Sequence, residues 1–290
     1  MSGHLQTSTL ARVLIIVLVI FHDVSGHGRL IEPPSRASMW RLGYDTPPNY
    51  DDNQLFCGGV GIQYGQNNGK CGVCGDPWNG RREHEAGGIY ANGIIVRKYE
   101  VGEPIKVKIE LTANHKGYFE FHICPTDNPF QKITETCLRK HPMTVVTTGK
   151  VRYQVPEGEY YSQQTYELYL LPPKNLRCKA CMLQWKYNAG NSWGTDKNGV
   201  SCIGCGDQEQ FYGCADIAIG HDDVVLGKPA VKHPWYFQEE TDIEWHIGVV
   251  HFKNGTKNSS PDLHARSGIS YRLLACLLTY VVTVWTILTS

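Results

Sequence analysis

Five segments of the chain alternate apolar and polar residues with a period of two, which is typical of β-strands that bury one face. They cover residues 105–111, 118–124, 166–171, 181–187 and 215–219. Proline and glycine separate neighbouring segments and indicate turns. No long amphipathic helix stands out. The pattern predicts an all-β fold of short strands joined by turns, as in a sandwich.

The N-terminal apolar run has the form of a secretory signal peptide. Residues 13–21 are apolar and follow Arg12, and the small residues Ser25 and Gly26 close the segment. The run is too short for a comfortable membrane span. We therefore expect residues 1–26 to be removed on secretion, so that His27 becomes the first residue of the mature chain.

A second apolar run lies at the C-terminus. Residues 273–288 are apolar apart from threonines and Tyr280, and a polar spacer separates them from the small residues of 258–260. This arrangement is typical of a glycolipid (GPI) anchor signal, which is removed when the anchor is attached. A short single membrane span is the alternative. We favour a GPI-anchored protein at the outer cell surface.

Between these ends, residues 27–220 have the usual size of one domain. Residues 33–93 are rich in glycine, asparagine, proline and aromatic residues, and such long irregular segments usually carry function. Residues 221–260 are polar and read as a C-terminal extension or stalk, with glycosylation acceptors at Asn254 and Asn258. Residues 261–290 then form the anchor signal or the span.

Composition narrows the function further. The chain has 28 basic and 28 acidic residues, so net charge gives no attraction to nucleic acid. One of the 11 cysteines, Cys276, lies in the C-terminal apolar run. In a secreted chain the other ten predict up to five disulfides rather than zinc sites, despite three C-x-x-C pairs. They are Cys57, Cys71, Cys74, Cys124, Cys137, Cys178, Cys181, Cys202, Cys205 and Cys214.

A mature chain that begins at His27 offers two nitrogens to one metal, the α-amine and a ring nitrogen. His115, between two predicted strands, is the best candidate for a second histidine ligand, although a histidine before a turn is often solvent-facing. His122 lies within a strand and is expected to be structural. Three nitrogens in an open T-shaped arrangement suit Cu(II). Phe211 and Tyr212 could supply an axial aromatic ring, and only one of them can point at the metal.

Three separated motifs carry a resemblance. They are His-Gly at residue 27, Ala-Asn-His-Lys-Gly-Tyr-Phe-Glu-Phe from residue 113, and Phe-Tyr-Gly-Cys-Ala-Asp-Ile from residue 211. In order and spacing they resemble the copper lytic polysaccharide monooxygenases. The cysteine-rich residues 58–88 and the run 184–193 resemble the animal branch, auxiliary activity family 15. The resemblance covers roughly residues 27–220.

The resemblance implies an immunoglobulin-like or fibronectin III-like β-sandwich with long disulfide-pinned loops and one copper on a flat face. His27 and His115 match the copper ligands, and Ala113 matches a small residue that keeps one axial side open. The axial ring is Phe211 or Tyr212, and the matching polar group that orients bound oxygen species is Glu209 or Gln210. The implied reaction is oxidative cleavage of chitin or cellulose at C1 or C4, with O₂ or H₂O₂ and an external electron donor. We expect a monomer.

Two other classes of function compete with this one. A non-enzymatic protein could use the same copper ligands for copper handling at the cell surface, and a matrix-binding module could use the disulfides without any metal. Aromatic residues of the loop from Trp40 to Tyr50 could stack on sugar rings or simply pack on the sandwich. The acidic pairs Asp51–Asp52 and Asp222–Asp223 are adjacent in loops, which does not favour two-carboxylate hydrolysis.

Overall fold

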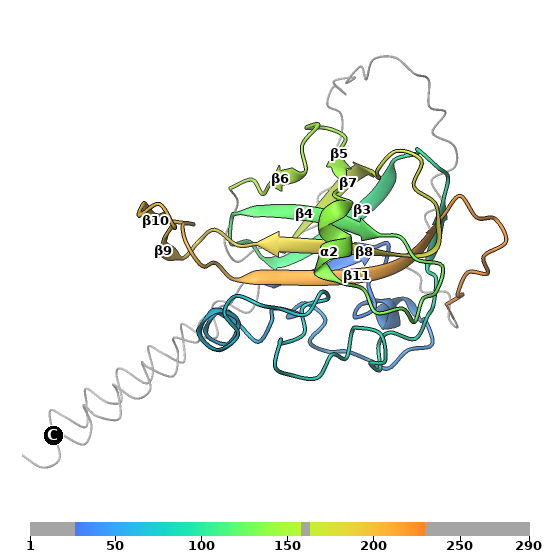
Figure 1. The fold of residues 1–290 in the computed structure, drawn as a ribbon, viewed down its shortest axis with the longest axis horizontal. Helices are drawn as coiled ribbons and strands as arrows, with labels where there is room; N and C mark the ends of the chain where they lie inside the picture. Colours follow the sequence, from blue (N-terminus) through green and yellow to red (C-terminus); the bar gives the residue numbers. More distant parts are fainter. Residues whose placement is uncertain (1–26, 158–162, 230–290) are drawn as a thin grey trace, which may run out of the picture. The chain divides into compact units, whose positions relative to one another are not determined.

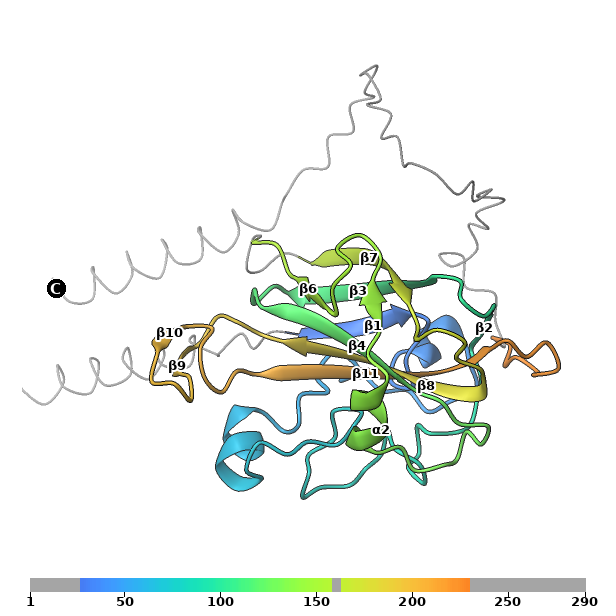
Figure 2. The same ribbon diagram turned by 45° about the horizontal axis from the view of Figure 1, so that its top comes forward.

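The computed structural model describes residues 27–157 and 163–229, which belong to one compact unit of the chain, Met1–Glu239. Two β-sheets pack against each other around the main core (Figures 1 and 2). The first sheet has the strand order β1 (His27–Glu32), β3 (Ile105–Ala113), β7 (Gln164–Leu171) and β5 (Thr144–Val145). The second has the order β2 (Arg97–Tyr99), β11 (Gln210–Ile219), β8 (Cys178–Asn188), β4 (Tyr118–Cys124) and β6 (Arg152–Gln154).

The remaining elements are short. A separate hairpin, β9 (Trp193–Thr195) with β10 (Ser201–Ile203), projects from one end of the sandwich in both views. The helical segments are a 3-10 turn (Met39–Leu42), a π-helical turn (Gly61–Gln66) and the helix α2 (Glu135–Lys140). In Figure 1, α2 lies across β4, β8 and β11.

Alternation along β3 and β4 builds one part of the core, whereas β8 and β11, the longest strands, are buried at nearly every residue. Burial alternates at every residue of β3, and nearly so in β4. The five segments that the sequence pattern predicted correspond to β3, β4, β7, β8 and β11, so the predicted all-β fold is confirmed. Burying a large apolar side chain contributes about 1.5–3 kcal/mol. The largest fully buried side chains are Trp185, Tyr187, Phe119, Phe121 and Phe211.

The ten predicted cysteines form five disulfides: Cys57–Cys71, Cys74–Cys214, Cys124–Cys137, Cys178–Cys181 and Cys202–Cys205. The prediction of a disulfide framework is therefore confirmed. With every one of these sulfurs in a covalent bond, none is left as the thiolate that zinc would need. Cys276 lies outside the described residues.

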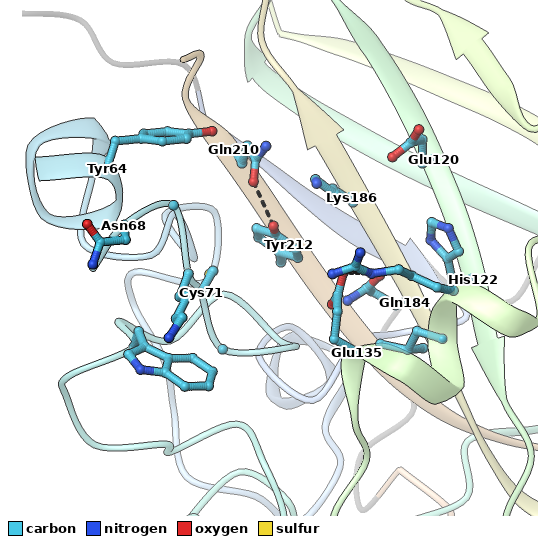
Figure 3. Close-up of a pocket in the computed structure, with 16 residues that line it drawn as sticks. Tyr64, Asn68, Cys71, Glu120, His122, Glu135, Gln184, Lys186, Gln210 and Tyr212 are labelled. Carbon is cyan, nitrogen blue, oxygen red and sulfur yellow. Dashed lines mark hydrogen bonds and ion pairs between the residues drawn. The ribbon is translucent and has the colours of Figure 1, made fainter. Parts of the chain in front are cut away.

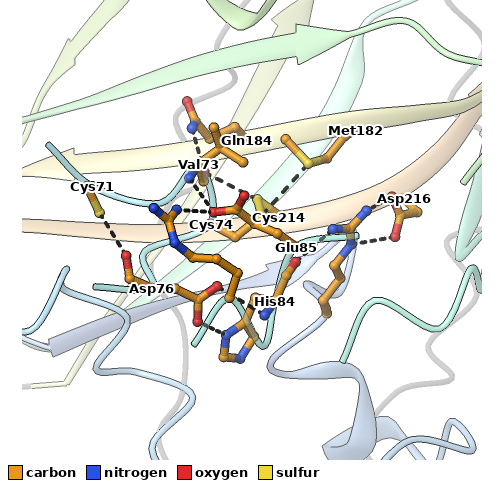
Figure 4. The surroundings of a disulfide bond; sticks show 12 residues. Cys71, Val73, Cys74, Asp76, His84, Glu85, Met182, Gln184, Cys214 and Asp216 are labelled. Carbon is orange, nitrogen blue, oxygen red and sulfur yellow. Dashed lines mark hydrogen bonds and ion pairs between the residues drawn. A yellow bond between two sulfur atoms is a disulfide. The ribbon is translucent and has the colours of Figure 1, made fainter. Parts of the chain in front are cut away.

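The long loop before β2 covers the outer face of the second sheet (Figure 4). The Cys74–Cys214 disulfide joins the loop to β11 across 140 residues of sequence. Beside it, the Gln184 side chain donates to the Val73 carbonyl at 2.7 Å. A buried bidentate pair, in which Arg36 donates to both Asp216 oxygens at 2.6 and 2.7 Å, holds the start of the loop to the same strand. The irregular segment is therefore a fixed wall rather than a loose connection.

Several predictions fall outside the described residues. They concern the signal peptide (1–26), most of the extension (221–260), the glycosylation acceptors Asn254 and Asn258, and the anchor signal (261–290). Within the described part of the chain, no helix is long and apolar enough to cross a membrane.

Candidate metal centre

His27 begins β1, an edge strand of the first sheet, and pairs with Ala113 near the end of β3. Two further contacts hold this end of the strand. The Gly28 amide donates to the Asn53 carbonyl at 3.0 Å, and the Thr112 hydroxyl donates to the His27 carbonyl at 3.3 Å. A Cβ added to Gly28 would lie 2.6 Å from the Leu111 side chain. The His-Gly sequence therefore allows β1 to pack closely against β3 and places His27 at the edge of the sandwich.

His115 follows β3 by two residues, so the pairing of His27 with Ala113 brings both histidines to the same end of this strand. The His115 amide donates to the Tyr187 hydroxyl at 2.9 Å, and its carbonyl accepts from the Gly190 amide at 2.8 Å. The chain then turns through Gly117 at φ 79°, where a Cβ would meet the Asn188 carbonyl at 2.0 Å.

One expectation for His115 has to be corrected. A histidine before a turn could have been solvent-facing, but His115 is only 6% exposed. Its main chain is tied on both sides, so the backbone that carries the ring has a defined position. This favours a ligand, because a side chain on a fixed backbone loses less entropy when it binds a metal.

Phe211 lies next to His27, and its ring centre is 6.3 Å from that of the imidazole, in an edge arrangement. The Phe211 ring is fully buried and stacks on Phe56 and Tyr187, with centres 6.1 and 5.8 Å away. Tyr212 points to the opposite face of β11, as the two-residue period requires. There its hydroxyl donates to the Gln210 side chain at 2.8 Å. The structure thus brings Phe211 to His27 and places Tyr212 on the far side of the sheet.

The two candidate polar residues separate in the same way. Gln210 shares the far face with Tyr212, where its amide contacts Gln63 and Asn188 at 2.9 and 3.0 Å. Glu209 precedes Gln210 and lies two residues before Phe211. By the two-residue period of a strand it therefore faces the same side as Phe211. Burial raises the pKa of Tyr187, and the charge of Glu209 raises it further, which places this carboxylate near the residue that holds His115.

The sequence analysis did not identify Gln54, Asn53 or Tyr187 as site residues. The Gln54 side chain hydrogen-bonds the His27 ring, Asn53 holds the Gly28 amide, and Tyr187 holds His115. Gln54 and Asn53 lie in the irregular loop, where no periodicity predicts which residue meets which strand. Tyr187 lies in a predicted strand, but its pattern indicates only burial and not the hydroxyl contact.

The residues present fit a copper ion bound through nitrogen. Burial lowers the pKa of the His27 imidazole, and the weaker opposing effect of the Gln54 hydrogen bond does not reverse this. Burial therefore favours the neutral ring, which is the form that binds a metal. Among residues 27–157 and 163–229, no group of three or more His, Cys, Asp or Glu side chains could hold a metal. The two histidines thus need a further donor, and an α-amine at His27 would be joined to the first ring.

Two other histidines of the described residues, His84 and His122, differ from this pair. His84 is buried, with its ring 2.8 Å from Asp76 and 3.0 Å from Asn49 and stacked on Tyr90, which is a structural role. His122 does not lie in the core. It is on the outer face of β4, lines a cavity there, and has a buried Nδ1 without a partner among the described residues.

An all-β sandwich that brings two histidines to the same end of β3, one of them at a predicted signal-peptide boundary, defines a class of copper proteins. The chain belongs to the lytic polysaccharide mono-oxygenase family, whose model is described as cellulose-degrading and matches residues 27–217. It is similar to the AA15 lytic polysaccharide monooxygenase of Thermobia domestica, solved in the Cu(I) state. The two are 40% identical, with a TM-score of 0.63 over 67% of this chain and 98% of that one. No match is found among curated protein sequences.

These comparisons confirm the resemblance seen in the motifs. The protein is a polysaccharide monooxygenase of the animal AA15 type, and its cofactor is copper. Its substrate class is polysaccharide, with an oxygen co-substrate and an electron donor, and the family agrees with export from the cell.

Proposed function

We propose that the mature protein, beginning at His27, oxidatively cleaves glycosidic bonds of chitin or cellulose at a copper held by His27 and His115. The observation that carries this proposal is the register of β1 on β3. It pairs His27 with Ala113, so the first residue of the mature chain lies beside the strand end that leads to His115. A single shift in that register would turn His27 to the other face of the sheet.

The residues around the pair have separate tasks in this proposal. The His27 amine, the His27 ring and the His115 ring hold the metal. Bound copper supplies one-electron redox chemistry that can activate O₂ or H₂O₂ against a strong C–H bond. Phe211 would pack beside the bound metal, since its ring is the aromatic group that contacts His27. The small side chain of Ala113 would leave room next to the metal. Gln54 and Tyr187 orient the two histidines.

Glu209 is the proposed polar group beside bound oxygen species. Two features support Glu209: it faces the same side as Phe211, and it is charged. Gln210 instead forms hydrogen bonds with Gln63, Asn188 and Tyr212 on the opposite face. A carboxylate near the metal can hold or release a proton during the reduction of oxygen.

The proposed substrate face includes the β9–β10 hairpin. The Gly190 amide binds the His115 carbonyl, and Trp193 begins the hairpin three residues later. Trp193 is 71% exposed and Ile203, opposite it in the hairpin, 62% exposed. Exposed aromatic rings beside a surface metal suit stacking on the sugar rings of a flat polymer.

The Trp40–Tyr50 loop contributes to this face only in part. Trp40 packs edge-on against Tyr50 and carries Arg41 over its ring at 4.5 Å. Tyr50 is 77% exposed and remains available for a sugar.

The decisive experiment uses copper-loaded protein beginning at His27, incubated with crystalline chitin or cellulose and a reductant. Oxidised oligosaccharides detected by mass spectrometry, with masses that distinguish C1 from C4 products, are the expected result. Tight copper binding without oxidised products from either polymer would instead favour a copper-handling protein at the cell surface.

The domain organisation stays part of the proposal. Residues 27–220 would form the catalytic domain, 221–260 a glycosylated stalk, and 261–290 a GPI-anchor signal. The chain would act as a monomer whose copper face meets polymer close to the membrane.

A further inference from the structure

A cavity of about 670 Å³ lies on the outer face of the second sheet, away from the core that contains Phe211 (Figure 3). Strands β4, β8 and β11 form one wall through Glu120, His122, Lys186 and Tyr212. The loop with Tyr64, Asn68 and Cys71 forms the opposite wall, and α2 closes one side. This volume is within the range of small-molecule sites.

Disulfides and hydrogen bonds fix the residues of the cavity wall in the absence of a ligand. The Cys57–Cys71 and Cys74–Cys214 disulfides fasten the loop, and the Gln63 amide donates to Gln210 of β11 at 2.9 Å. The Tyr64 hydroxyl donates to the Gln208 carbonyl at 3.0 Å. A preformed wall reduces the entropy lost on binding.

The charged side chains that line the cavity do not neutralise one another. Glu120 pairs with Arg152 at 2.7 Å, and Glu135 of α2 pairs with Arg139 at 3.1 Å, so both lining carboxylates already have a cation. Lys186 lies opposite Glu120 in the pairing of β8 with β4, and the charges of Glu120 and Glu135 oppose the lowering of its pKa by burial, but it forms no direct ion pair among the described residues. Its ammonium lies 5.7 Å from the centre of the Tyr212 ring. Lys70 likewise contacts only a ring, that of Trp78 at 5.5 Å. The cavity therefore has an excess of positive charge.

Further polar atoms line the cavity around these charges. The His122 side chain interacts with Gln184, but its buried Nδ1 has no partner within the described ranges, and an unmet polar atom costs free energy until a ligand satisfies it. The Glu120 carboxylate can accept hydrogen bonds, and the Asn68 amide can donate or accept them. Tyr64 and Tyr212 add ring surface between these groups. The set suits a ligand with one negative charge and several hydroxyls.

We propose that this cavity binds a sugar acid, with its carboxylate at Lys186 and its hydroxyls toward His122 and Glu120. Burial lowers the pKa of Lys186, and an anion in contact with the ammonium favours its charged form. The site is separate from the copper ligands, and its binding does not depend on catalysis.

The test measures binding by titration calorimetry on the intact mature protein, with gluconate, glucuronate, neutral glucose and inorganic phosphate as probes. At least one sugar acid should bind saturably with a Kd of about 1 mM or below. Lys186→Met should weaken that binding about tenfold or more, because a charge-assisted hydrogen bond is lost.

Lys179→Met is the matched control. Lys179 lies on the same strand, but it is exposed and already paired with Asp223 at 2.8 Å, so its loss should leave the affinity unchanged. Copper titration and thermal melting of both variants verify that the fold and the metal centre are intact. Equal binding of glucose or phosphate, unchanged binding by Lys186→Met, or no saturable binding of either acid would overturn the proposal.

Discussion

In the proposed copper site, the α-amine of His27 is a donor that a single additional N-terminal residue would remove. One extra residue before His27 would convert this amine into an amide and displace the new terminus from the metal. We expect such an extended protein to lose well over about 100-fold in copper affinity, more than an outer-shell change costs. Competition titration against a copper chelator measures this, with protein beginning at His27 as the reference. Equal affinity of the two forms would contradict a terminal copper ligand.

The two histidines of neighbouring segments, His115 and His122, should behave differently. His115→Ala should abolish oxidised product and weaken copper binding, because a ring with a fixed position at the metal is lost. His122→Ala should leave both unchanged, since His122 lies on the outer face of β4. Product analysis and copper titration of the two variants form a matched comparison. The reverse pattern would move the ligand to His122.

Phe211 and Tyr212 give a similar comparison on one strand. Only the Phe211 ring contacts His27, at 6.3 Å between ring centres. Phe211→Tyr should therefore change the electron paramagnetic resonance spectrum of Cu(II), because it brings a hydroxyl toward the metal. Tyr212→Phe should leave the spectrum as it is and lose only the hydrogen bond to Gln210. A changed spectrum in Tyr212→Phe alone would assign the axial position to Tyr212.

Buried and exposed ion pairs should differ sharply in their effect on folding. Arg36 and Asp216 are each 3% exposed, so Asp216→Asn leaves a buried guanidinium without its counter-charge. We expect the free energy of unfolding to fall by about 3–5 kcal/mol. Glu135→Gln breaks an exposed pair with Arg139 and should cost less than about 1 kcal/mol. Chemical denaturation at neutral pH compares the two, and similar losses would show that Arg36 finds another partner.

At the scale of elements, the disulfides differ in how far along the chain they reach. Cys74–Cys214 joins residues 140 positions apart, whereas Cys202–Cys205 joins residues only 3 apart. A cross-link over a long loop removes more entropy from the unfolded chain. Replacing Cys74 and Cys214 by alanine should cost about 2–5 kcal/mol, and replacing Cys202 and Cys205 less than half of that. Denaturation of the two double variants measures this ratio, and the reverse order would contradict it.

The elements also show how far sequence reasoning reaches. Strands β3, β4 and β7 were predictable because each buries one face and alternates over several residues. Strands β8 and β11 were predicted from the same kind of sequence pattern, but nearly every residue of both is buried. The two-residue and three-residue strands β2, β5, β6, β9 and β10 are too short for a period to show. β1 was not predicted either, because His27–Glu32 pairs with residues more than 70 positions away and local sequence does not reveal such a partner.

The site follows the same rule. His27 was proposed from a processing signal and His115 from its place between two strands, and the structure brings both to the same end of β3. The choice between Phe211 and Tyr212 could not be made, because alternation separates their faces without saying which face holds His27. Gln54 reaches His27 from an irregular loop, and only tertiary structure establishes that contact.

For the whole molecule, delivery to the cell surface is a separate prediction that concerns residues outside the described ranges. The C-terminal apolar segment of residues 273–288 would span about 24 Å as a helix, against a hydrocarbon core of about 30 Å. Such a mismatch favours a transient anchor signal over a permanent span. Phosphatidylinositol-specific phospholipase C should therefore release the protein from cells. Retention on the cells, with an antibody still detecting residues 273–290, would show a membrane span instead.

Because His27 is the first residue of β1, the active protein would form in two steps, folding first and removal of residues 1–26 second. The pairing of β1 with β3 uses the main chain from His27 onward, so the sandwich can form while residues 1–26 are still attached. The amine needed by copper exists only after that segment is cut away. Removal of the signal peptide would then be the step that activates the enzyme. A chain still in the cytosol would carry out no copper redox chemistry, even when copper is present.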